Sequence, residues 1–153
     1  GLIARSGTVD AELLASLDAL PFYSQTGAKS LGREWVEKEI FPMIDSRGLE
    51  FADLLSTFTE HAARQVARVV RRVGKPHPTM LITGGGALNV YLVERIRELA
   101  GCEVKIPPRQ IIEFKEALIF AFLGALYMAD EASCLSSVTG AATDNIGGML
   151  FKI

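Results

Sequence analysis

The chain has 153 residues, of which 49% are hydrophobic and 22% are charged. This composition excludes a disordered chain and is enough for a real core, so we expect a single domain over residues 1–153. The net charge of −2 gives no reason to expect a nucleic acid or an acidic membrane surface as a partner.

The cysteines and the chain start favour a cytoplasmic location. Cys102 and Cys134 lack the spacing of metal ligands, which fits a reducing compartment, and we expect the chain to bind no metal itself. No basic segment precedes an apolar one at the start, so we expect no signal peptide. The longest apolar run, residues 117–128, is too short to span a bilayer and predicts a core helix.

The first elements are predicted to be short. Residues 2–5 are interpreted as an edge strand, and Asp10 is a good N-cap for a helix over residues 11–17. Residues 21–29 are expected to be irregular and anchored by two aromatic side chains. The apolar face of the helix is formed by Leu13, Leu14 and Leu17, and the anchors are Phe22 and Tyr23.

A second helical region follows. We predict a helix over residues 30–38 with Ser30 as its cap, and a connector over residues 41–48. The longest helix is expected over residues 50–73 and to end at Gly74. Its apolar stripe consists of Phe51, Leu54, Leu55, Phe58, Ala62, Val66, Val69 and Val70.

The opposite side of this long helix carries four arginines. A phosphate-binding stripe is one interpretation, but we favour a solvated face because the net charge is negative and no aromatic residues interleave. His61 has no second ligand nearby and is expected to be a packing or surface histidine. The arginines are Arg64, Arg68, Arg71 and Arg72.

A glycine turn between a strand and a helix is the most informative segment. Residues 79–83 predict a buried strand, three glycines follow, and Asn89 is placed to cap a helix that ends at Gly101. Free backbone N–H groups and the positive end of the helix dipole can bind an anion there. The spacing matches neither a P-loop nor a dinucleotide fingerprint, so a connection without a ligand remains equally open.

The remaining elements complete an α/β pattern. A strand over residues 102–106 should pair in parallel with the strand before the glycines. Residues 114–129 are apolar on nearly every face, which predicts a helix buried between layers. Lys115 and Glu116 are expected at its N-terminus. Residues 133–145 are predicted to be a loop, and residues 148–153 a closing strand.

Four stretches in this order resemble the C-terminal half of the anhydro-N-acetylmuramic acid kinase family, within the actin-like ATPase and sugar kinase superfamily. The resemblance covers nearly the whole chain, although the family has a proline where this chain has Ser136. The stretches are residues 29–35 (KSLGREW), 81–89 (LITGGGALN), 115–121 (KEALIFA) and 137–141 (SVTGA).

The resemblance implies a C-terminal nucleotide-binding lobe of a two-lobed actin-like (ribonuclease H-like) fold, with a layered sheet and helices on both faces. It implies a parent kinase that converts 1,6-anhydro-N-acetylmuramic acid, ATP and water to N-acetylmuramate 6-phosphate in peptidoglycan recycling. The phosphate-binding motif and catalytic aspartate belong to the family's N-terminal half, so the isolated chain should be inactive. Mg²⁺ would be held mainly by that half and the nucleotide.

The implied site residues form two groups. ATP would meet the glycine turn, and the amino sugar would meet Glu116, for which helix-start electrostatics is the structural alternative. Four further residues are candidates for the sugar side, and a surface ion pair is the alternative for Arg33. The ATP group is Gly84, Gly85, Gly86, Ala87 and Asn89, and the further sugar candidates are Lys29, Arg33, Ser137 and Thr139.

The N-terminal lobe of the same protein is an expected partner, and a second copy of the chain is a further candidate. Two other functions stay open. One is a different sugar or acetate-type kinase of the superfamily, against which residues 137–141 argue. The other is a non-catalytic nucleotide-binding module, which the absence of the first lobe would support.

Overall fold

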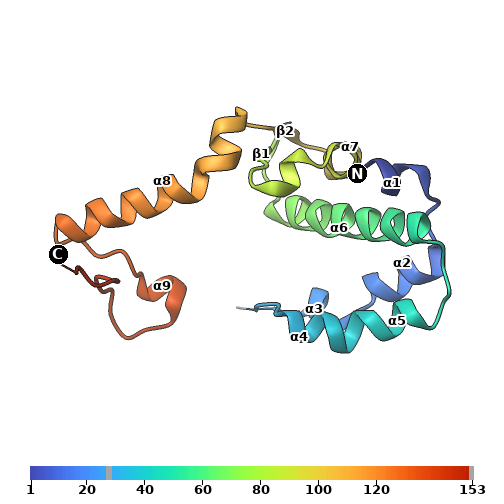
Figure 1. Ribbon diagram of the computed structural model, residues 1–153, viewed down its shortest axis with the longest axis horizontal. Helices are drawn as coiled ribbons and strands as arrows, with labels where there is room; N and C mark the ends of the chain where they lie inside the picture. The colour runs from blue at the N-terminus through green and yellow to red at the C-terminus, as the bar shows by residue number, and fades with distance from the viewer. Residues whose placement is uncertain (27–28, 152–153) are drawn as a thin grey trace. The chain divides into compact units, whose positions relative to one another are not determined.

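The computed structural model describes residues 1–26 and 29–151, and it is an α/β structure of helices with a small parallel sheet (Figure 1). Its contacts divide the chain into two compact units, residues 1–107 and 108–153. Within the described ranges, every helix is too short or too polar to cross a bilayer.

The first unit is built around α6 (Phe51–Val73), which packs against a different cluster toward each end. Toward its N-terminal end, Leu54 and Phe58 contact a cluster that includes α2 (Ala11–Asp18). As predicted, Asp10 caps α2, because its carboxylate accepts a 2.6 Å hydrogen bond from the Leu13 amide. The buried members of this cluster are Leu13, Leu17, Leu20 and Ile40.

Toward the C-terminal end of α6, Ala63 and Ala67 pack against α7 (Val90–Ala100). Both alanines are fully buried, and their small side chains let the two helices approach closely. Gly74 and Gly101 end α6 and α7 in the left-handed conformation that favours glycine, as predicted.

The sheet of this unit has two parallel strands, β1 (Thr79–Leu81) and β2 (Glu103–Lys105), as predicted, with Met80 opposite Val104. Met80 and Val104 pack on the cluster between α6 and α7, whereas the outer residues of both strands are exposed. Among the described residues of this unit, helices therefore cover one face of the sheet, and the predicted second helical layer is not seen.

The chain start corrects one prediction. The expected strand over residues 2–5 is instead the helix α1 (Leu2–Ser6), and Ala4 is buried in it. The helix packs against α6, and the two strands of the sheet pair with each other, so no neighbouring strand stabilises an extended conformation here. Packing against α6 therefore overrides the weak preference of these residues for a strand.

The segment before α6 is more helical than predicted. The expected irregular segment begins with α3 (Pro21–Ser24), and the next helix begins after Gly32 without a side-chain cap from Ser30. The predicted connector 41–48 contains a helix with Pro42 near its start, directly after a π-helical turn. These elements are α4 (Arg33–Trp35), the π-helical turn η1 (Val36–Ile40) and α5 (Phe41–Asp45).

The predicted apolar stripe of α6 is confirmed in part, because Leu54, Phe58, Val66 and Val70 pack against the two clusters. Phe51 and Val69 are 63% and 59% exposed, whereas Glu60 and His61 are buried. Hydrophobic periodicity does not predict this burial, because it counts only apolar residues. Glu60 and His61 are buried because they have polar partners inside the unit.

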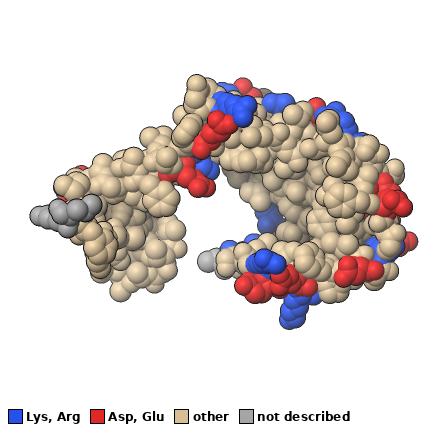
Figure 2. Space-filling view, viewed as in Figure 1, with Lys and Arg blue, Asp and Glu red and all other residues tan. Residues whose placement is uncertain are grey.

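The second unit contains α8 (Arg109–Met128) and the short α9 (Ser136–Thr139). Ile112 is the buried residue of α8, while Phe114 and Leu118 are 63% and 61% exposed, so the predicted burial between layers is wrong for this structure. The described part of this unit contains no second long helix or sheet to cover α8. On the face shown in Figure 2, charged side chains of this unit gather at the start of α8, and the rest of the unit is almost wholly uncharged.

The loop predicted over residues 133–145 contains α9 and is closed by an antiparallel bridge between Cys134 and Asn145. The expected closing strand is not formed over residues 148–151, because no strand of the unit pairs with it. The last two residues of that prediction, 152–153, lie outside the described residues.

The cap at Asp10 gives a test of the first unit. Asp10→Ala should lower the free energy of unfolding by about 1–2 kcal/mol, because the Leu13 amide loses its acceptor. Asp10→Asn keeps an acceptor oxygen but loses the ion pair with Arg47, so it should recover most of the loss. Urea unfolding followed by circular dichroism measures both. Equal losses of unfolding free energy in the two variants would show that the ion pair with Arg47, and not the cap, stabilises the unit.

Candidate functional site

The glycine turn leaves β1 in a backbone conformation that other residues avoid. Gly84 has φ 79° and ψ −178°, a region open essentially to glycine. The 3₁₀ turn η2 (Gly85–Leu88) follows, and it is closed by hydrogen bonds from Ala87 N to Gly84 O at 3.0 Å and from Asn89 N to Gly86 O at 3.1 Å. Gly84 therefore sets the direction of the turn.

The next two glycines have no structural requirement for glycine in the described residues. A Cβ at Gly85 or Gly86 would have no heavy atom within 4 Å, and neither residue has a positive φ. Their N–H groups precede the first bonded turn and have no backbone partner among the described residues. The outer face of the turn is therefore open, with two donors available to an approaching ligand.

The helix after the turn is capped as predicted. The Asn89 side-chain oxygen accepts from Leu92 N at 3.2 Å, which uses the oxygen and leaves the side-chain NH₂ group free for another acceptor. The positive end of the α7 dipole lies at the same point. Beside the turn, the Thr83 hydroxyl is buried and has no hydrogen-bond partner among the described residues. The arrangement can bind an anionic or polar ligand through backbone donors.

Lys29 and Arg33 are not brought to this turn. Lys29 Nζ donates to the Phe22 carbonyl oxygen at 2.7 Å, and Arg33 Nε contacts Glu37 at 2.6 Å in an exposed pair. Lys29 lies between α3 and α4, and Arg33 begins α4; these two helices are on the side of α6 opposite to β1 (Figure 1). The surface ion pair considered for Arg33 is therefore present.

The other sugar candidates lie in the second unit. Glu116 is exposed and is the eighth residue of α8, because the helix begins at Arg109, so its predicted place at the helix N-terminus is wrong. Pro108 precedes the first turn, and α8 extends upstream of the apolar run from which its start was predicted. Ser137 is exposed, whereas the Thr139 hydroxyl donates to the Leu135 carbonyl oxygen at 3.0 Å.

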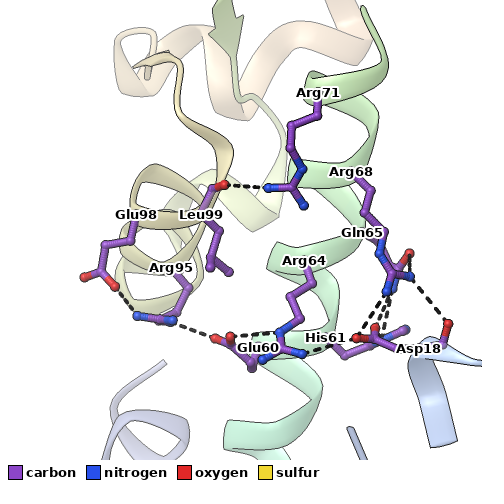
Figure 3. Close-up of polar contacts among 10 residues, drawn as sticks. All are labelled: Asp18, Glu60, His61, Arg64, Gln65, Arg68, Arg71, Arg95, Glu98 and Leu99. Carbon is purple, nitrogen blue, oxygen red and sulfur yellow. Dashed lines mark hydrogen bonds and ion pairs between the residues drawn. The ribbon is translucent and has the colours of Figure 1, made fainter. Parts of the chain in front are cut away.

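A buried polar network in the first unit is the main feature that sequence reasoning missed (Figure 3). The Asp18 carboxylate contacts His61 Nδ1 at 2.8 Å and accepts from Gln65 Nε2 at 2.7 Å. Arg64 and Arg68 each come within 3.4 Å of the same carboxylate. Both arginine side chains stay partly solvated, at 43% and 38% exposed, as predicted, but they also pair with the Asp18 carboxylate, which the prediction did not include.

The imidazole of His61 joins this network to an aromatic side chain. Its Nε2 lies 2.9 Å from the Tyr23 hydroxyl, and the residue is only 5% exposed. Burial lowers the pKa of His61, although the Asp18 carboxylate opposes this shift. The neutral imidazole therefore donates from Nδ1 to Asp18 and accepts at Nε2 from Tyr23, which confirms a packing role.

A second buried carboxylate ties α6 to α7. Glu60 accepts from Arg64 Nε at 3.1 Å and from Arg95 Nε at 2.8 Å, and Arg95 also pairs with Glu98 (Figure 3). Burial alone would raise the pKa of Glu60, but the hydrogen bonds from Arg95 and Arg64 lower it. Arg71 adds a second link between α6 and α7 by donating to the Leu99 carbonyl oxygen at 3.1 Å.

The sequence contained a signal for part of this network. Glu60 and Arg64 are four residues apart with the acid first, which is the favoured order for a helical ion pair. The contacts of Asp18 with α6 span more than forty residues, and no local spacing predicts them.

Comparisons with known proteins agree over the whole chain. A family model described as anhydro-N-acetylmuramic acid kinase matches residues 1–152. Relatives with that name include proteins of Variovorax paradoxus (37% identical), Xanthomonas oryzae pv. oryzae (35%) and Hahella chejuensis (32%). Each alignment covers 99% of this chain but only 41–42% of the relative, so the chain spans less than half their length.

The buried histidine predicts a pH dependence. Because its pKa is lowered in the folded state, the unfolded chain takes up the proton first as the pH falls below about 6.5. The contribution of neutral His61 to the free energy of unfolding is thus complete above that pH. Below that pH it is lost, by at most about 1.4 kcal/mol per pH unit. Urea unfolding at pH 7.5 and 5.5 should show this loss.

His61→Gln should remove most of this pH dependence. The control is His77→Asn, because His77 is the other histidine, is exposed, and has a φ of 48° that asparagine tolerates. If the control flattens the profile as much as His61→Gln, the buried histidine is not the titrating group.

Proposed function

Because the chain belongs to the anhydro-N-acetylmuramic acid kinase family, we propose that it supplies the adenosine-binding side of an ATP-dependent kinase for 1,6-anhydro-N-acetylmuramic acid. The observation that carries this proposal is the open glycine turn. Gly85 and Gly86 are required by neither packing nor backbone conformation, so their missing side chains are explained by a ligand that approaches the backbone closely.

In the proposed reaction, water opens the anhydro bridge of the sugar while O6 receives the phosphoryl group of ATP. The products are N-acetylmuramate 6-phosphate and ADP. Residues 84–89 would hold the nucleotide through backbone N–H groups and the start of α7. No cluster of metal-ligating side chains occurs in the described ranges, so Mg²⁺ would neutralise phosphate charge with ligands from the nucleotide and the rest of the parent protein.

The sugar side is proposed for the second unit. Glu116 has an exposed carboxylate without a hydrogen-bond partner in the described part of the chain, so it is available to accept from sugar hydroxyls. Ser137 offers an exposed hydroxyl on α9, whereas the Thr139 hydroxyl already donates to the Leu135 carbonyl oxygen and is a weaker candidate. Lys29 and Arg33 remain weaker candidates, because their charged groups already have local partners.

At the level of the fold, we propose that residues 1–153 act as one lobe of a two-lobed actin-like kinase. The rest of the longer parent would supply the phosphate-binding motif and the catalytic aspartate, and a second copy is a candidate partner. A cytoplasmic location, where ATP is available, accompanies the proposal. The match to a named sugar kinase family over nearly every residue favours it over another kinase of the superfamily.

The glycine turn is tested in the full-length parent by Gly85→Val. The branched side chain would occupy the open face, so ATP should bind at least about ten-fold more weakly, a loss of about 1.4 kcal/mol. Calorimetric titration with ATP measures the affinity, and a melting curve checks the fold. The control is Gly124→Val, since Gly124 also has open space around its Cβ position and lies outside the turn. Unchanged ATP affinity in Gly85→Val would mean that the glycine turn only connects β1 to α7 and binds no ligand.

The sugar side is tested by Glu116→Gln in the same parent. Loss of a charge-assisted hydrogen bond should lower kcat/KM for the sugar by about ten- to a hundred-fold and leave the KM for ATP unchanged. The melting temperature should not change, because Glu116 is exposed in the middle of α8.

The matched control is Glu113→Gln on the same helix, which removes only a surface pair with Arg109. Steady-state kinetics with each substrate varied in turn gives the comparison. A changed melting temperature with unchanged kinetics in Glu116→Gln would mean that Glu116 has a purely structural role.

A further inference from the structure

A pocket of about 320 Å³ lies between α3 and α6 in the first unit. One wall is aromatic, because the rings of Phe22 and Tyr23 meet edge-on with centroids 5.5 Å apart. The floor is apolar and comes from Val66 and Val69 of α6. None of the residues that line it belongs to the glycine turn, so this is a separate site.

The charged lining of the pocket has one sign. Lys29, Arg68 and Arg72 line it, and no carboxylate does. The Lys29 ammonium group lies 4.6 Å from the centroid of the Phe22 ring, and the two arginines are one helical turn apart. Asp18 pairs with Arg68 from outside the lining, and Lys29 Nζ donates to the Phe22 carbonyl oxygen, whereas Arg72 has no acidic partner among the described residues, so the lining carries a net positive charge.

Buried side chains next to the pocket hold two of its polar lining residues, Tyr23 and Gln65, in place. The Tyr23 hydroxyl lies 2.9 Å from His61 Nε2, and Gln65 Nε2 donates to Asp18 at 2.7 Å. The side chains of His61 and Asp18 are only 6% and 12% exposed. Because these contacts fix the wall residues before a ligand arrives, binding loses less side-chain entropy than at a mobile surface.

We propose that this pocket binds a phosphate monoester with a small, flat apolar body. A phosphate monoester carries close to two negative charges at neutral pH and suits three cations better than a carboxylate does. The aromatic wall and valine floor would pack against a ring, and the volume is at the lower end for small-molecule pockets.

Phenyl phosphate is the probe. Titrated into the ¹⁵N-labelled 153-residue chain, it should give saturable amide shifts at Tyr23, Gln65 and Val69, while phenol and inorganic phosphate bind at least about ten-fold more weakly. Arg72→Gln should weaken phenyl phosphate binding about five- to ten-fold, because it removes one charge at the pocket rim. Lys75→Gln makes the same charge change just beyond α6 and should have no effect.

Four results would overturn the proposal. Shifts that spread over the basic surface without saturation would indicate general charge attraction, as would equal losses in Arg72→Gln and Lys75→Gln. Shifts confined to residues 84–89 would mean that the phosphate is recognised by the glycine turn. Equal affinity for inorganic phosphate would exclude a role for the aromatic wall.

Discussion

Two largely buried carboxylates, Asp18 and Glu60, link α6 to its neighbouring helices in the first unit. Asp18 ends α2 and reaches α6 from outside, whereas Glu60 belongs to α6, and each carboxylate accepts from arginine or amide donors (Figure 3). The Glu60 side chain is only 7% exposed, so removing one of its arginine donors would leave a poorly solvated charge without its partner and should destabilise the unit. The positions of α2 and α7 against α6 are therefore set by these hydrogen bonds and ion pairs as well as by apolar packing.

The same constraint fixes the glycine turn. Arg95 and Arg71 tie α7 to α6, and the buried alanines of α6 bring the two helices close. The turn joins β1 to this anchored helix, so its free N–H groups have a defined direction before any ligand arrives. A binding site on rigid elements needs this kind of support from residues that never touch the ligand.

Much of this arrangement is readable from local sequence. The caps at Asp10 and Asn89, the glycine ends of α6 and α7, and the parallel strand pair all follow from short-range rules and are confirmed. The failures have long-range causes. Residues 2–5 are helical because they pack on α6, and the buried face of α6 is polar because Asp18, far away in sequence, supplies its partner. At the site, the turn was predictable from its glycines, whereas the position of Glu116 within α8 was not, because the helix starts before its apolar run.

The central claim is that residues 84–89 bind the nucleotide, and hydrogen–deuterium exchange of the full-length parent tests it most directly. With saturating ATP and Mg²⁺, the peptide that covers residues 82–90 should exchange more slowly than in the free protein, because the N–H groups of Gly85 and Gly86 gain acceptors. Peptides from α2 and the middle of α6 are already protected by the core and should not change. Unchanged exchange over residues 82–90, with protection by ATP elsewhere in the protein, would contradict the account.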